Sequence, residues 1–200
     1  MKKALVALAL VSSLVLSGCG RAGSAATVGD INISESRVQT LIDSIISERT
    51  HYDTSGMQLV TGADLNRSQV RFVIVTTLFD EIAKELKVNV TPGDLISVRN
   101  NVLAQVGGEG QLASALVSAN IAPESLDPYL RMTVITDKIR QGLLANGVAE
   151  ADVDATFNNI ITKKSQQLNI QINPRYGQWD AATGAVVASS IASDVVATLK

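Results

Sequence analysis

Two residues stand out as candidates for chemistry, because the chain has a single cysteine, Cys19, and a single histidine, His51. An imidazole does more than titrate only when a nucleophile, a base or a metal ligand stands beside it. His51 lies in the polar stretch Arg-Thr-His-Tyr-Asp, with no cysteine or second histidine near it in the sequence. We therefore expect a solvated loop histidine. The cysteine differs, because its neighbours form a pattern.

The stretch before Cys19 has a positive end, a short apolar core and small residues next to the thiol (Lys2, Lys3, residues 4–16, Leu16, Ser17 and Gly18). That order is typical of an export signal. It resembles a bacterial lipoprotein signal peptide, which is cut before the cysteine of a Leu-Ser-Gly-Cys lipobox. The thiol then carries a diacylglycerol, with or without a further N-acyl chain. The sequence thus predicts a signal peptide over residues 1–18 and lipidation at Cys19.

The length of the apolar run separates two kinds of membrane anchor. A helix needs about 20 apolar residues to cross a bilayer, and residues 4–16 are too few. Two or three acyl chains hold a protein at a bilayer far better than one. We therefore expect a lipid anchor on the extracytoplasmic face of the bacterial cell membrane. The alternative is an ordinary secretory signal in which Cys19 is incidental.

Composition excludes several classes of function. The formal net charge is −2, without the excess of basic residues that nucleic-acid binding calls for. With Cys19 lipidated, no thiol remains for a disulfide, a redox pair or a metal site. Aromatic residues make up 4% of the chain and aliphatic residues dominate the apolar part, which favours packed helices. We expect no nucleic acid, no metal and no cofactor besides the lipid.

Three further patterns fail as catalytic or ligand-binding motifs. The acidic run from Asp152 has Phe157 where a calcium loop turns on glycine. The Gly-Gly-Glu-Gly stretch at 107–110 lacks the Gly-Lys-Ser/Thr ending of a phosphate loop and follows a predicted helix, so it indicates a helix stop. Asp80 precedes Lys84 by four residues, the spacing of a surface ion pair rather than of an acid–base pair.

Apolar residues at intervals of three and four predict a mainly α fold of about five to six helices. Capping residues mark three starts: Ser34, Asn66, and Thr91 followed by Pro92. Further helices are expected around residues 112–116, 130–143 and 153–168, and a loop over residues 50–63.

A small β element accompanies these helices. Gly29-Asp30 predicts a tight hairpin within residues 28–33, and the alternation over residues 169–173 predicts a strand. Since a lone strand needs a partner, we expect the two to pair. The expected organisation is a tether over 19–26, one helical domain over 27–180, and a tail over 181–200 that is a frayed helix or disordered.

Several phrases resemble a known family. They are Val-Gly-Asp-Ile-Asn-Ile-Ser at the hairpin, Val-Thr-Pro-Gly-Asp-Leu at a helix start, Gly-Gly-Glu-Gly-Gln-Leu, Leu-Asp-Pro-Tyr-Leu-Arg, and the closing segment over residues 173–180. Together they resemble the amino-terminal domain of SurA and of the PrsA foldases, the last phrase resembling actinobacterial members. The resemblance covers about residues 27–180.

That resemblance implies binding of unfolded exported proteins outside the cytoplasmic membrane. Catalytic members also carry a parvulin prolyl isomerase domain inserted after the long helix. The matching position here is residues 145–148, which leaves no room for an insert. Parvulins also use histidines in the active-site core, whereas this chain has only His51. We therefore expect no isomerase activity and no enzyme.

The expected function is a non-catalytic chaperone, or holdase, that contacts unfolded or exported polypeptides and reaches the membrane through its lipid. Candidate contacts with such clients are Met57, Leu59 and Val60 in the loop, and Tyr176 and Trp179 near the end of the domain. For the loop residues, the alternative is that they fold back on the body; Trp179 is more simply explained by packing over its own core. Two other functions stay open: an adaptor lipoprotein with one partner, and a residual prolyl isomerase.

Overall fold

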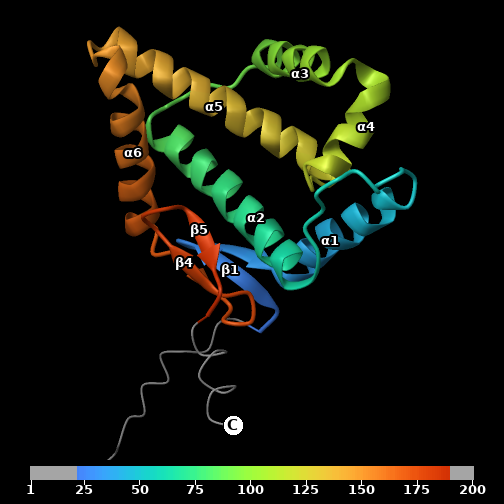
Figure 1. The fold of residues 1–200 in the computed structure, drawn as a ribbon. Coiled ribbons are helices and arrows are strands. Elements are labelled where there is room, and N and C mark those ends of the chain that lie inside the picture. The colour runs from blue at the N-terminus through green and yellow to red at the C-terminus, as the bar shows by residue number, and fades with distance from the viewer. Residues whose placement is uncertain (1–21, 190–200) are drawn as a thin grey trace, which may run out of the picture.

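The computed structural model describes residues 22–189 (Figure 1). Its elements are, in order, β1 (Ser24–Val28), β2 (Ile31–Ser34), α1 (Glu35–Arg49), α2 (Gly62–Glu85), α3 (Pro92–Val106), α4 (Glu109–Ser118), η1 (Pro123–Ser125), α5 (Leu126–Ala145), η2 (Glu150–Asp152), α6 (Val153–Gln167), β3 (Gln171–Ile172), β4 (Gln178–Asp180) and β5 (Ala185–Val187). The predicted mainly α fold with a small β element is confirmed. Cys19 and the lipobox residues Leu16, Ser17 and Gly18 lie outside the described residues.

Two of the three predicted helix caps are confirmed. The Ser34 hydroxyl accepts a hydrogen bond from the Arg37 N–H at 3.2 Å, which satisfies one free donor at the start of α1. At α3, Thr91 and Asp94 form a capping box, with the Thr91 N–H donating to the Asp94 carboxylate at 2.8 Å. The third was wrong: Thr61, not Asn66, is the cap residue of α2.

The earlier start of α2 has a packing cause. Leu65 is only 2% exposed, in the first turn of the helix, and this burial extends the helix toward the N-terminus beyond Asn66. The first residue of α2 is Gly62, whose φ of +55° is a left-handed conformation that glycine adopts readily. Helix α2 therefore begins within the loop predicted over residues 50–63.

The three-stranded sheet has the order β2-β1-β3. Gly29, at φ +58°, makes the turn between β1 and β2, as predicted. Ala26 pairs with Ile172 and Thr27 with Gln171, both antiparallel. This confirms that the N-terminal hairpin pairs with a C-terminal strand, although the pairing residues lie just before the predicted range 28–33. That strand is shorter than 169–173, because Asn169 at φ +44° leaves the extended conformation.

The fold begins earlier than the sequence predicted. β1 starts at Ser24, and Ser24, Ala25 and Ala26 are 6%, 0% and 2% exposed. The tether over 19–26 and the domain start at residue 27 were therefore wrong for these three residues. Glycine, alanine and serine resemble a linker in sequence, yet their small side chains let a strand lie closely against α2.

The fold also ends later than predicted. β4 and β5 form an antiparallel hairpin in which Gln178 pairs with Val187 and Asp180 with Ala185. The tail predicted over 181–200 was therefore wrong for the residues through β5, while residues 190–200 lie outside the described part. The Asp180 carboxylate holds the turn by accepting hydrogen bonds from the Thr183 hydroxyl at 2.6 Å and the Ala182 N–H at 2.9 Å.

Helix α2 connects two apolar cores. Its first half packs with the sheet and α1 through Val70, Val73 and Ile74. Its second half packs with α5 and α6, around Leu78 and Ile82. The helices α3 and α4 form an arm beside α5 (Figure 1), and α3 has no buried residue. Within residues 22–189, no helix is long and apolar enough to cross a membrane.

Candidate binding groove

Two adjoining hollows run along α2. The larger, ≈ 500 Å³, lies among α2, α5, α6 and the turn between β4 and β5. The smaller, ≈ 230 Å³, lies among α2, α5, the end of the loop after α1 and the segment after α4. Arg71, Val75 and Met132 line both. We therefore treat the two hollows as one surface, the α2 groove.

The groove has an apolar floor and a polar rim that is uncharged except for Arg71. The floor is built mainly from Phe72, Val75, Phe79, Met132, Ile161 and Trp179, and the rim from Ser68, Asn120, Thr136, Asn158 and Thr162. Among the described lining residues, Arg71 alone carries an ionisable side chain. Its Nε donates to the Gly184 carbonyl at 2.7 Å. The lining can thus bury apolar groups and hydrogen-bond an amide backbone.

Helical spacing explains why these side chains meet. Ser68, Phe72, Val75 and Phe79 recur at intervals of three and four along α2, so they share one face. Val75 and Met132 are only half-buried, although both are apolar. The fold therefore leaves apolar surface uncovered in the middle of the groove.

Trp179 forms one end of the groove. Its indole Nε1 donates to the Ser165 hydroxyl at 2.7 Å, and Ser165 is 2% exposed. The ring packs against the core around the sheet, so the predicted packing of Trp179 over its own core is confirmed. The same ring also lines the larger hollow.

The opposite end is fixed by a polar cluster around Asn120. Its side-chain oxygen accepts hydrogen bonds from the Val60 N–H at 3.1 Å and from Arg49 Nη2 at 2.7 Å. Arg49 Nη2 also donates to the Val60 carbonyl, and Gln69 Nε2 donates to the Asn120 carbonyl. Burial lowers the pKa of Arg49. These bonds hold the end of the long loop against the segment after α4.

The structure brings two of the five predicted client contacts to the groove. Val60 and Trp179 line its smaller and larger hollows. Met57 and Leu59 are half-buried in the loop and do not line it. Tyr176 packs against the core near the sheet, and its pKa is raised first by burial and then by the charge of Glu35.

The side chains considered for catalysis lie elsewhere. His51 is exposed in the loop after α1, which confirms the solvated histidine. The predicted pair of Asp80 with Lys84 was wrong. The Asp80 carboxylate instead accepts a hydrogen bond from Arg131 Nε at 2.6 Å, across the interface of α2 and α5. Lys84 Nζ lies 3.9 Å from Glu81 Oε1.

Sequence reasoning missed the centre of the groove. Phe72 and Val75 of α2 line this centre but are not among the client contacts that the sequence predicted. The available signal was the width of the apolar face, which is broader than one packed helix interface requires. Met132 gave a weaker signal, since a methionine often fills a core gap.

Within residues 22–189, no three His, Cys, Asp or Glu side chains gather closely enough to hold a metal ion. Comparisons with family models, with curated proteins and with solved structures found no match. The resemblance to SurA and PrsA therefore rests on short sequence phrases and stays a proposal.

Proposed function

We propose that this protein is a lipid-anchored, extracytoplasmic chaperone that holds unfolded or exported polypeptides without a catalytic step. The observation that carries the proposal is the α2 groove, a continuous surface with an apolar floor and a hydrogen-bonding rim that is uncharged except for Arg71. An extended chain offers alternating side chains and a free amide backbone. The apolar floor of the groove can contact the side chains, and its polar rim can hydrogen-bond the backbone.

The chemistry of the floor suits clients of many sequences. Met132 adapts its shape to different partners because its side chain is unbranched and flexible. Burying one aliphatic side chain contributes about 1.5–3 kcal/mol, and ordering the client offsets part of that gain. A few such contacts give weak, reversible binding, which a holdase needs in order to release its client.

The proposed membrane location depends on the short distance between Cys19 and the fold. Only a few residues separate Cys19 from Ser24, the first residue of β1. At about 3.5 Å per residue, the chain spans at most about 18 Å between them. Since the sheet lies at one end of the helices (Figure 1), a lipid on Cys19 would hold that end near the membrane.

Suppression of aggregation tests the proposal. The full chain in nanodiscs of zwitterionic lipid should reduce light scattering by several unrelated denatured proteins. Val75→Gln with Met132→Gln should weaken this at least about threefold, because each glutamine places a polar amide in the apolar floor. Ile96→Gln is the matched control, since Ile96 is 61% exposed on α3 and outside the groove.

Two outcomes would contradict the proposal in favour of another function. No suppression for any client, together with one tight partner in pull-downs, would indicate an adaptor. Acceleration of a proline-limited refolding reaction that disappears with His51→Ala would indicate a prolyl isomerase.

A further inference from the structure

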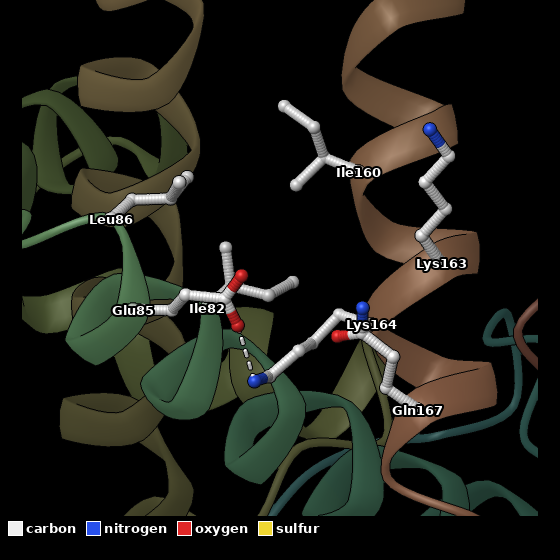
Figure 2. Close-up of a pocket in the computed structure, with 7 residues that line it drawn as sticks. All are labelled: Ile82, Glu85, Leu86, Ile160, Lys163, Lys164 and Gln167. Carbon is white, nitrogen blue, oxygen red and sulfur yellow. Dashed lines mark hydrogen bonds and ion pairs between the residues drawn. The ribbon is translucent and has the colours of Figure 1, made fainter.

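Apart from the α2 groove, a small hollow lies between the C-terminal end of α2 and α6 (Figure 2). We call this hollow the notch. Its volume is ≈ 150 Å³, and Ile82, Leu86 and Ile160 form its apolar part. Leu86 is 45% exposed although it is aliphatic. The α6 residues that line this notch differ from those that line the α2 groove. The notch is therefore a separate surface.

Positive charge borders the notch. Lys163 and Lys164 lie on its α6 side, and Lys164 Nζ contacts Glu85 Oε2 at 2.5 Å, the pair dashed in Figure 2. Lys163 extends away from that pair and forms no ion pair with any residue in the described range 22–189.

The charge here is opposite in sign to that of the whole chain, whose formal net charge is −2. Glu85 is engaged by Lys164, so the charge of Lys163 is left for a ligand. A carboxylate placed over the aliphatic floor would meet Lys163, while an ammonium group would be repelled. The notch thus combines an apolar floor with selectivity for negative charge.

The size of the notch limits the occupant. Sites for whole small molecules usually measure about 300–1,000 Å³, and this hollow is smaller. It suits one aliphatic side chain rather than a ring system or an acyl chain. A peptide can supply that side chain and a carboxylate from the same residue or from its neighbour.

We propose that the notch binds an acidic apolar peptide segment of a client, with one aliphatic side chain between Leu86 and Ile160 and an adjacent carboxylate at Lys163. The inference rests on the proposed client-binding function and adds a preference to it. The carboxylate belongs either to the C-terminus of the client or to an aspartate or glutamate side chain.

Peptide binding to the full chain in zwitterionic nanodiscs tests this inference. The probes are fluorescent peptides of equal length and equal apolar content. One ends in an aliphatic residue with a free carboxylate, a second is its C-terminal amide, a third is that amide with one internal aspartate, and a fourth carries lysine in place of the aspartate. We expect the two acidic probes to bind about three- to tenfold more tightly than the amide, and the lysine probe most weakly. Comparing the first and third probes shows which source of carboxylate is preferred.

The variants locate the effect. Lys163→Gln should remove most of the acid-to-amide difference, and Leu86→Gln should weaken the acidic probes. Arg37→Gln is the matched control, because Arg37 is an exposed cation on α1 outside the notch. High salt should reduce the difference as well, since exposed charges are screened.

Distinct results would overturn the inference and the proposed function. Equal affinity for the acid and amide probes, or an affinity difference that persists in Lys163→Gln, would overturn the proposed peptide site in the notch. Neither result would affect the proposed role of the α2 groove. Failure of every probe to bind, at any salt concentration, overturns both.

Discussion

At the scale of single residues, the pKa of Asp94 is strongly lowered by its neighbours. The Lys138 ammonium, 2.6 Å away, and the N–H and hydroxyl of Thr91 together lower the pKa of Asp94 to about 2. Lys138 Nζ also donates to the Asn89 carbonyl at 2.9 Å. This cluster fixes the start of α3 on α5, although α3 buries no residue of its own.

Acid should therefore loosen α3 first. A lowered carboxyl pKa contributes stability that is fully present above the unfolded value near 3.8 and is lost as the pH falls toward about 2. The protection factors of the α3 amides, which correct for the pH dependence of intrinsic exchange, should fall across that interval in the wild type. Asp94→Asn should show faster exchange at neutral pH and no comparable acid step. Asp64→Asn, at an exposed residue of the first turn of α2, serves as the control. An unchanged acid step in Asp94→Asn would rule out this role.

Trp179 permits a second test at the same scale. Trp179→Phe keeps an aromatic ring but removes the hydrogen bond to the buried Ser165 hydroxyl. We expect a loss of about 1–2 kcal/mol in the free energy of unfolding, because a buried hydroxyl is left without its partner. Urea denaturation measures it. Trp179→Phe with Ser165→Ala should recover part of the loss, and equal stability of the wild type and Trp179→Phe would contradict the assignment.

At the scale of elements, the hairpin of β4 and β5 forms a wall of the α2 groove and depends on one glycine. Gly177 has φ +123°, and a Cβ there would lie 2.1 Å from the Val187 carbonyl oxygen. Because that oxygen belongs to the backbone, relief of the clash requires the hairpin to move. The sequence shows none of this, since the partner strand lies in the segment that was expected to be a tail.

Gly177→Ala should thus displace the hairpin and destabilise the fold by at least about 1–3 kcal/mol. The single tryptophan of the chain is a direct reporter, and its fluorescence should shift to longer wavelength as Trp179 becomes more exposed. Gly56→Ala is the control, because a Cβ at Gly56 would meet no atom within 4 Å. If the two variants have identical spectra and stability, the hairpin is not held in this way.

Elements were predictable where local chemistry fixes them. Ser34 and the pair Thr91 and Asp94 cap their helices through bonds within one turn, so sequence alone located these starts. The start of α2 depends on the burial of Leu65, and β1 packs against α2 and is flanked by the distant strand β3 as well as by β2. Neither cause is visible in a local window of sequence.

Of the residues that line the α2 groove, the sequence singled out only those at its two ends. Val60 and Trp179 stood out because of a loop and a rare residue type. The middle of the groove depends on which part of the broad apolar face of α2 is left uncovered by α5 and α6. Only the packed structure shows that Val75 and Met132 are half-buried there.

At the scale of the whole molecule, α2 joins the two cores and borders both proposed surfaces. Its middle forms the groove, and its C-terminal end forms the notch. The proposed lipid would attach a few residues before β1, at the sheet end of the molecule. With that lipid in place, both proposed binding surfaces would lie along the helices, away from the attachment point.

The anchor has its own test. Cys19→Ala should abolish metabolic labelling with palmitate and release the protein from the membrane fraction, because the acyl chains have no other thiol to join. Ser17→Ala, which keeps a small residue before the cysteine, should retain the label. Persistent labelling of Cys19→Ala would remove the lipoprotein proposal and leave the fold unaffected.

The most direct measurement is site-specific photocrosslinking in living cells. A photoreactive amino acid at position 132, in the middle of the groove, should capture several different exported polypeptides. The same group at position 96, exposed on α3 outside the groove, should capture few. Adducts of equal amount and identity at both positions, or none at position 132, would contradict the claim that the α2 groove holds unfolded clients.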